Sequence, residues 1–359
     1  MEHLKDIFLA GTISMFIGIC TMPLLRRLAR QLKLVDKPNF RKLHTSPIPL
    51  VGGICIAMST WLTMLLIDTF TDSSQDISFL LAMGLILLVL GIIDDKWDIP
   101  ALSKLIIQLL CAGIIAWSGI RISSLYGIFG IYDIPVGAQY LLTVVVITGV
   151  VNAFNLMDGI DGLAGSLAVL GFLALAILSC LMGKYTIAIL YAAIIGSVIG
   201  FLRFNLSQKK TFLGDGGSLF LGFILVVSGI QILEWGKEAS GILPDITTIM
   251  VIGIFMIPVL DSLRVYRGRI GNGDSPFTPD KSHLHHLFLL LGLTHVRTSL
   301  FIVITSLLLL TFSAYLAQFL SVTLVIGLYA VLFLLLTNLL TVNKQMVEWQ
   351  GKVQHMEQE

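Results

Sequence analysis

Eleven continuous apolar runs divide this chain, and they constrain its fold more than any other feature. They cover residues 7–25, 50–67, 78–93, 104–119, 136–153, 162–181, 185–202, 216–234, 246–263, 299–317 and 320–341. A membrane-spanning helix needs about 20 apolar residues, and the runs lack the alternation of a barrel strand. With 56% hydrophobic and only 13% charged residues, the chain carries too much apolar surface for a soluble core. The sequence predicts an all-α integral membrane protein with about 11 transmembrane helices, of which the third is short.

The positions of the lysines and arginines predict the orientation of these spans. If the N-terminus lies outside, the inner side receives residues 26–49, 94–103, 154–161, 203–215, 264–298 and the C-terminal tail. With Lys104 counted at its loop edge, all but four of the 23 Lys and Arg then lie inside, the exceptions being Lys5, Arg121, Lys184 and Lys237. This follows the positive-inside rule and predicts a cytosolic C-terminus in one multi-span domain, 1–359. The formal net charge of +1 argues against a nucleic-acid partner.

The same threading brings the acidic residues near span ends to the inner side, although it uses only lysines and arginines. These residues are Asp94, Asp95, Asp98, Asp158, Asp161 and Asp215. Ionisable side chains beside membrane spans are costly and indicate functional sites by default. Their shared location predicts a single site on the cytosolic face.

The first acidic motif is DDKWD, residues 94–98 at the end of the third run. On a helix, Asp94 and Asp98 share a face because they are four residues apart. Like charges on one face repel, so the spacing predicts a cation nearby, either Mg²⁺ with a phosphate or Lys104. The alternative is an ordinary acidic helix end in solvent.

The second motif is NAFNLMDGIDGL, residues 152–163, between two apolar runs. If its first half continues the fifth helix, Asn152, Asn155 and Asp158 form one stripe. Gly159 and Gly162 allow the backbone to turn and to approach a ligand closely. Amide and carboxylate oxygens suit a hard cation that keeps some water. Polar packing between helices is the alternative.

The third motif is FLGDGGS, residues 212–218, directly before a run. Free backbone N–H groups at a helix N-terminus can bind an anion, and Asp215 among them could hold a metal that bridges to phosphate. A plain tight turn is the alternative.

Two basic segments on the inner side are further candidates for substrate binding. In the loop 264–298, Arg264, Arg267 and Arg269 suit phosphate, while His283, His285 and His286 suit phosphate, sugar or metal. This loop is long enough for a lid or a small amphipathic helix. In DKPNFRKLH, residues 36–44, Arg41 and His44 belong to a nucleotide-side loop or to a basic membrane anchor. Solvated basic loops remain the alternative for both segments.

Taken together, these motifs and the VDKPNFRK-H…PLVGG segment resemble the polyprenyl-phosphate N-acetylhexosamine-1-phosphate transferases over roughly residues 30–290. The resemblance implies transfer of a sugar 1-phosphate from a cytosolic UDP-N-acetylhexosamine to a polyprenyl phosphate, with release of UMP. It also implies a bacterial inner membrane, undecaprenyl phosphate as the acceptor and a role in cell-surface polysaccharide synthesis. The implied cofactor is Mg²⁺, with Mn²⁺ as a substitute, and a homodimer remains open.

The resemblance also suggests roles for individual residues. It implies Mg²⁺ on Asn155 and Asp215, a uracil contact at Asp161 and an aromatic stack on Phe212. Lys104 matches a lysine that contacts the diphosphate, and the histidine loop faces the sugar. From the charge of the reactants we expect Asp94 and Asp95 mainly to orient substrate or metal, since a phosphate monoester is already mostly ionised at pH 7. Asp158 belongs to the catalytic set, and Asp98 to substrate binding.

The sequence departs from one branch of the family. The muramoyl-pentapeptide transferases have a lysine at the position of Asp98, Thr-Pro-Thr in place of Ile48-Pro49-Leu50, and HHH rather than HLHH. These differences argue against that donor but do not decide among the N-acetylhexosamines. The resemblance itself favours N-acetylglucosamine. A lipid or ion transporter is the alternative class, but it would place acids deep in the spans and often shows internal repeats. A CDP-alcohol phosphotransferase would carry a DGxxAR signature that this sequence lacks.

Overall fold

The computed structural model describes residues 2–36, 46–67, 74–241, 243–271, 273 and 282–356. Its helices are α1 (Glu2–Gln31), α2 (Gly52–Leu66), α3 (Ser74–Trp97), α4 (Ala101–Trp117), α5 (Val136–Asn155), α6 (Leu163–Leu181), α7 (Tyr185–Asn205), α8 (Gly214–Lys237), α9 (Leu243–Gly271), α10 (Leu284–Leu289), α11 (His295–Leu316) and α12 (Val322–Met356). A 3-10 turn, η1 (Ile128–Gly130), and the antiparallel strands β1 (Val35–Asp36) and β2 (Ile48–Pro49) complete the described elements. The predicted helical class is confirmed.

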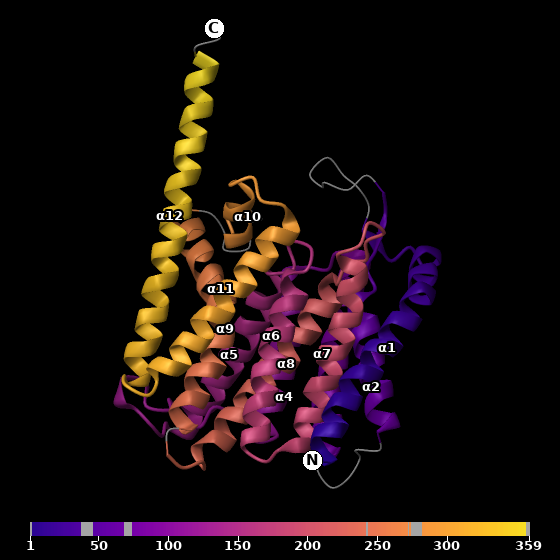
Figure 1. Cartoon of the computed structure of the whole chain (residues 1–359), viewed down its shortest axis with the longest axis vertical. Coiled ribbons are helices and arrows are strands. Elements are labelled where there is room, and N and C mark those ends of the chain that lie inside the picture. The colour runs from indigo at the N-terminus through magenta and orange to yellow at the C-terminus, as the bar shows by residue number, and fades with distance from the viewer. Residues whose placement is uncertain are drawn as a thin grey trace.

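Each of the eleven predicted apolar runs lies on a helix of its own. Within the described ranges, nine helices are long and apolar enough to cross a membrane, while α2 and α4 are apolar but have only 15 and 17 residues. The prediction of a short third span is wrong, because α3 continues through the polar residues at both ends of its apolar run to a length of 24 residues. Figure 1 shows α1 beginning at one end of the bundle and α12 ending beyond the other.

Helix α8 lies at the centre of the bundle. Of its most apolar stretch, 94% is buried, and it packs against α2, α3, α5, α6 and α9. Helices α2 and α3 contact the N-terminal turn of α8 through glycines on both sides of each contact. A Cβ placed on Gly91 of α3 would lie 2.2 Å from the amide nitrogen of Gly216, and one on Gly53 of α2 would lie 2.4 Å from the Cα of Gly217. Only glycine permits such backbone contact, so these residues bring three helix ends together.

The segment that precedes α2 is hydrogen-bonded to the segment that precedes α8. The amide of Phe212 donates to the carbonyl of Pro49 (2.9 Å), and the amides of Gly52 and Gly53 donate to the carbonyls of Phe212 and Leu213 (both 3.0 Å). The PLVGG and FLGDGGS motifs, more than 150 residues apart, therefore form one local structure.

Helices α1, α11 and α12 lie at the periphery. Only 22%, 28% and 28% of their most apolar stretches are buried within the protein. Exposed leucines cover their outer surfaces, among them Leu24 of α1 (59% exposed) and Leu339 of α12 (70% exposed). In a membrane protein such faces contact lipid.

Candidate active site

Three elements bring four carboxyl groups together at one end of the bundle. Asp94 and Asp95 end α3, Asp215 begins α8, and Asp158 lies in the turns between α5 and α6. The carboxylate of Asp95 accepts a hydrogen bond from the amide of Asp215 (3.1 Å), and the carboxyl groups of Asp94 and Asp215 are hydrogen-bonded to each other. Two neighbouring carboxylates require a shared proton or a cation. The prediction that the acidic residues of the three motifs lie close together is therefore confirmed, whereas their roles stay predictions.

Lys104 of α4 supplies one cation to this cluster. Its Nζ lies 2.5 Å from Oδ2 of Asp94, and Oδ1 of Asp94 accepts a hydrogen bond from the amide of Ile99 (3.1 Å). Asp94 is only 6% exposed. The prediction of a cation beside DDKWD is therefore confirmed with Lys104 in that position.

The prediction that Asp94 and Asp98 share a helical face is wrong. Helix α3 ends at Trp97, and Asp98 follows in a left-handed conformation (φ 49°). Its side chain is exposed and does not line the cavity described below.

The prediction of a substrate-anion site on the free amides that precede α8 needs a correction. The amides of Asp215 and Gly216 bind the carboxylate of Asp95, so the anion at this helix N-terminus belongs to the protein itself. Gly216 and Gly217 are covered by α3 and α2, and Gly214 has a left-handed backbone (φ 76°). Gly214 therefore permits the turn before α8, and Gly216 and Gly217 permit the close packing of α3 and α2 against it.

The two asparagines of the second motif have different partners. The amide of Asn152 donates to Oε1 of Gln108 in α4 (2.6 Å), which is packing between helices. Oδ1 of Asn155 accepts a hydrogen bond from the hydroxyl of Ser218, one turn into α8. Helix α5 ends at Asn155, so Asp158 follows in a turn and the expected three-residue stripe is only partly helical.

Asp215 and Asn155 have the chemistry of a partial Mg²⁺ site. Ser218 connects the side chain of Asn155 to the backbone of Asp215, because its hydroxyl donates to Oδ1 of Asn155 and lies 3.2 Å from the backbone carbonyl oxygen of Asp215. Among the described residues, no three His, Cys, Asp or Glu side chains form a complete ligand set. Mg²⁺ usually takes one or two carboxylates and completes its shell with water and substrate phosphates. The crowded carboxyl groups, only one of which is paired with Lys104, therefore fit this ion.

Asp158 lies in an environment that disfavours its ionised form. Burial raises the pKa of Asp158 well above its usual value, and the charges of Asp215, Asp95 and Asp161 raise it further. A cation in this cluster would reverse the effect of the neighbouring charges.

Asp161 has the opposite environment three residues later. Burial alone would raise its pKa, but hydrogen bonds from His295 and Lys210 outweigh burial and the pKa is lowered. Nδ1 of His295 lies 3.4 Å from Oδ2 of Asp161, and the hydroxyl of Ser299 donates to the backbone carbonyl of Asp161 (2.7 Å). Asp161 is thus a fixed anion at the start of α6.

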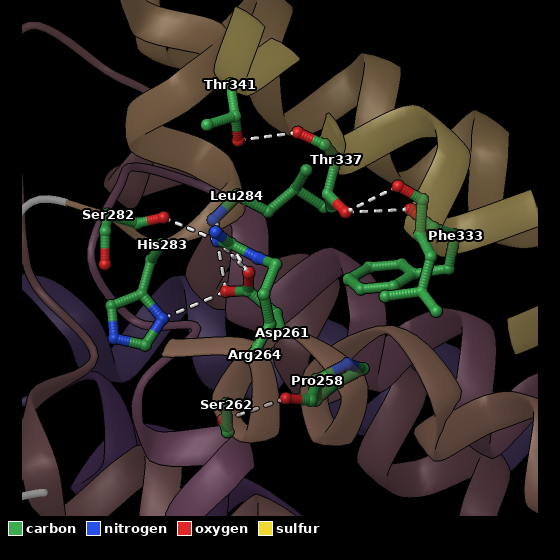
Figure 2. A network of polar contacts seen from close by, with 11 residues as sticks. Pro258, Asp261, Ser262, Arg264, Ser282, His283, Leu284, Phe333, Thr337 and Thr341 are labelled. Atoms are coloured by element: carbon green, nitrogen blue, oxygen red, sulfur yellow. Dashed lines mark hydrogen bonds and ion pairs between the residues drawn. The ribbon is translucent and has the colours of Figure 1, made fainter. Parts of the chain in front are cut away.

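The histidine segment is anchored on Asp261 of α9 (Figure 2). Nδ1 of His283 lies 2.9 Å from Oδ2 of Asp261, and Nη2 of Arg264 lies 2.7 Å from its Oδ1. The amide of Leu284 also donates to this carboxylate, at 3.0 Å. Arg264 lies on α9, which continues to Gly271, so its predicted place in a free loop is wrong. Arg267 lies on the same helix and is exposed.

The other two histidines lie within α10, the small helix expected in this loop. His285 is 2% exposed, and a Cβ placed on Gly159 would lie 2.5 Å from its Nε2. Burial, followed by the charges of His286 and His283, lowers the pKa of His285 to about 3. His285 therefore packs as a neutral ring against the 158–163 turn, whereas His286 faces the cavity.

A cavity of about 1270 Å³ opens at this end of the bundle. Six of the predicted site residues line it: Asp95, Asp158, Asp161, Phe212, Asp215 and His286. Others support its wall from behind: Asp94, Lys104, Asn155, His283, His285 and Arg264. Arg41 and His44 lie outside the described residues, so their predicted role stays a prediction.

Several residues at the site gave little signal in the sequence. Asp261 lies inside an apolar run, Lys210 is one of two adjacent lysines in a polar loop, and His295 is the first residue of α11. Arg26, Arg27 and Arg30 also line the cavity. Their clustering was visible in the sequence, but it could not be distinguished from a positive-inside anchor.

The fold and site define a class: a multi-pass helical membrane protein with a carboxylate-lined cavity at one end of its bundle. Residues 77–233 match the family described as glycosyl transferase family 4. Over 298 residues the chain is 33% identical to the undecaprenyl-phosphate alpha-N-acetylglucosaminyl 1-phosphate transferase of Escherichia coli K12, covering 81% of this chain and 77% of that protein. It is 32% identical over 295 residues to the probable undecaprenyl-phosphate N-acetylglucosaminyl 1-phosphate transferase of Bacillus subtilis, covering 82% and 80%. The chain belongs to glycosyl transferase family 4.

Proposed function

We propose that this protein transfers N-acetylglucosamine 1-phosphate from UDP-N-acetylglucosamine to undecaprenyl phosphate and releases UMP. The product is a lipid diphosphate-linked sugar for cell-surface polysaccharide synthesis, made at the cytosolic face of the bacterial inner membrane. The main support is the gathering of Asp95, Asp158 and Asp215 on one cavity wall, in a chain 33% identical to a transferase with this name.

The reaction is an in-line displacement at the phosphorus that carries the sugar. An oxygen of the lipid phosphate forms the new P–O bond, and the bond to the bridging oxygen of UMP breaks. Since the attacking phosphate is already mostly ionised at pH 7, the main barrier is repulsion between anions. When bound at Asn155 and Asp215, Mg²⁺ would neutralise the diphosphate oxygens and stabilise the leaving UMP.

The carboxylates of α3 then have orienting roles. Asp95 is held by the N-terminal amide of α8, and it fixes the position of Asp215 relative to α3. Asp94 holds the ammonium of Lys104 at the edge of the cluster, where it can shift to a diphosphate oxygen. If Asp95 were instead the base, the rate of Asp95→Asn would recover fully as the pH is raised.

The nucleotide and sugar would lie along the rest of the wall. Phe212 offers an aromatic face for uracil, and the anion of Asp161 can accept a hydrogen bond from the base. His286 lies beside the sugar, and the Asp261 anchor holds its segment in place. Asp98 and Arg267 are exposed and have at most a peripheral part in binding.

The test is UMP release by the purified full chain in detergent. We expect UMP with UDP-N-acetylglucosamine, undecaprenyl phosphate and Mg²⁺, lower rates with Mn²⁺, and little with UDP-muramoyl-pentapeptide. Other UDP-N-acetylhexosamines in the panel establish the donor. Absence of UMP with every donor would overturn the proposal, and movement of a lipid across vesicles without bond breakage would favour a transporter.

A further inference from the structure

One face of α1 carries three arginines that the roles above do not use. Pro23, Arg26, Arg27 and Arg30 all line the cavity. Their spacing of three, four and seven residues places them on one helical stripe, in the last two turns of α1. The helix therefore presents a basic wall to the cavity that also contains Asp95 and Asp215.

Among the described residues, no acidic side chain forms an ion pair with these three arginines. Arg26 and Arg30 are close enough to repel each other. The Nε of Arg26 is buried, and no described residue accepts a hydrogen bond from it. Five acids also line the cavity: Asp36, Asp95, Asp158, Asp161 and Asp215. Asp161 is paired with Lys210 and His295, and Asp95 is bonded by the amide of Asp215.

We propose that Arg26, Arg27 and Arg30 form a phosphate-binding site on the cavity wall. Guanidinium groups bind phosphate through paired N–H donors, and a buried donor without a partner gains most from such a ligand. The reaction proposed above brings two phosphate-bearing molecules to one cavity, and the carboxylate cluster serves only one region of it. The site deepens that proposed function and rests on it for its physiological ligand.

A positive-inside anchor does not explain this stripe. Arg203, in the last turn of α7, is also basic and exposed but does not line the cavity. An anchor needs only to contact headgroups and water. Arg27 and Arg30 are also exposed, but together with Arg26 they line the cavity. Arg203 is therefore a matched control.

Two sources could supply the phosphate. Leu24 and Leu28 of α1 are 59% and 42% exposed, so the arginines lie between a lipid-facing surface and the cavity. A lipid phosphate can reach them from the bilayer, with its chain along α1. A nucleotide phosphate can reach them from within the cavity. The shared chemistry is an arginine-bound phosphate group, and the experiment separates the two sources.

The experiment compares the Arg26→Gln, Arg27→Gln and Arg30→Gln single variants and their triple variant with Arg203→Gln, using the full chain in detergent. One arm measures the KM for UDP-N-acetylglucosamine and the Kd of UMP. The other measures the KM and Kd of undecaprenyl phosphate. For at least one of the two arms, we expect the triple variant to raise both the KM and the Kd about tenfold or more. Arg203→Gln should leave these constants unchanged. The arm that responds identifies the source.

A triple Arg→Lys variant separates recognition from charge and from folding. It keeps the positive charges that orient the helix but lacks the guanidinium fork, so we expect a several-fold loss of affinity in the same arm. The proposal is wrong if neither arm differs from Arg203→Gln, or if kcat alone changes. If the wild type releases no UMP, the proposed function fails, but the two Kd measurements still decide the arginine site.

Discussion

The two ends of α8 each carry an acidic cluster, and the two clusters have opposite character. At the C-terminal end, Glu234 accepts hydrogen bonds from the amide of Ser123 (3.0 Å), from its hydroxyl (2.7 Å) and from the hydroxyl of Tyr126. Lys237 also bonds to Ser123 (2.7 Å) and to Asp133 (3.3 Å). At the N-terminal end, Asp215 lies among three other carboxyl groups beside a large cavity.

This contrast separates a structural carboxylate from a functional one. The carboxylate oxygens of Glu234 accept hydrogen bonds from the loop that they hold in place, so this carboxylate needs no additional ligand. The cluster around Asp215 concentrates negative charge for which Lys104 is the bonded cation, and such an arrangement is costly unless another ligand binds there.

Asp215→Asn should lower the rate of UMP release by about a thousandfold, because it removes the carboxylate proposed to hold the cation. The amide has nearly the same size, so the protein should remain folded. The measurement is UMP release at saturating substrates, together with the thermal unfolding midpoint in detergent. A rate within tenfold of wild type would remove Asp215 from the catalytic centre.

Gly91→Ala should lower the rate about a hundredfold. The new methyl group would lie 2.2 Å from the amide nitrogen of Gly216, so α3 must move away from α8 and take Asp95 with it. A displacement of about 1 Å can cost a hundredfold in rate. Gly113→Ala is the control, since no described atom lies within 4 Å of a Cβ built there. Equal activities of the two variants would show that the approach of α3 to α8 does not set the site.

Glu234→Ala should destabilise the protein by about 2 kcal/mol, because it leaves the partly buried donors of Ser123 and Tyr126 without this acceptor. The rate per folded molecule should stay within twofold of wild type. Glu238→Ala, at an exposed carboxylate four residues later, should change neither quantity. A large loss of rate with normal stability would mean that this end of α8 also takes part in the reaction.

The smallest effect concerns pH and His285. Its pKa is lowered to about 3 in the folded protein from an ordinary value of 6.5, so the unfolded chain binds more protons between these values. Stability therefore rises with pH across that window and is lost on acidification, by about 1.4 kcal/mol at pH 5.5. Thermal midpoints of wild type and His285→Gln at pH 7.5 and 5.5 should differ by this contribution. Parallel pH dependences would show that His285 is not held neutral.

Much of this architecture could be predicted because hydropathy and charge act on whole segments. The apolar runs gave the eleven apolar helices, and the distribution of Lys and Arg was enough to place Asp95, Asp158 and Asp215 at one end of the bundle. The side-chain partners could not be predicted in the same way. Which face of α3 meets α8 depends on Gly91 and Gly216, whose contact is a property of packing.

Other features escaped because their sequence signal had a simpler explanation. Asp261 lies inside the predicted apolar run 246–263, and only the approach of His283 and Arg264 shows what it anchors. The α1 arginines match a basic anchor until the cavity shows where they face. The helical continuation through Arg264 and Arg267 was missed because polar residues after an apolar run do not by themselves end a helix.

The central claim is that Asp215 and Asn155 hold a divalent cation within the carboxylate cluster, and Mn²⁺ binding measured by electron paramagnetic resonance tests it most directly. Wild-type protein and Glu234→Ala should each bind about one Mn²⁺ per chain, competed by Mg²⁺, whereas Asp215→Asn should lose this binding. Retention of the bound ion by Asp215→Asn, or its loss in Glu234→Ala, would contradict the distinction between the two ends of α8.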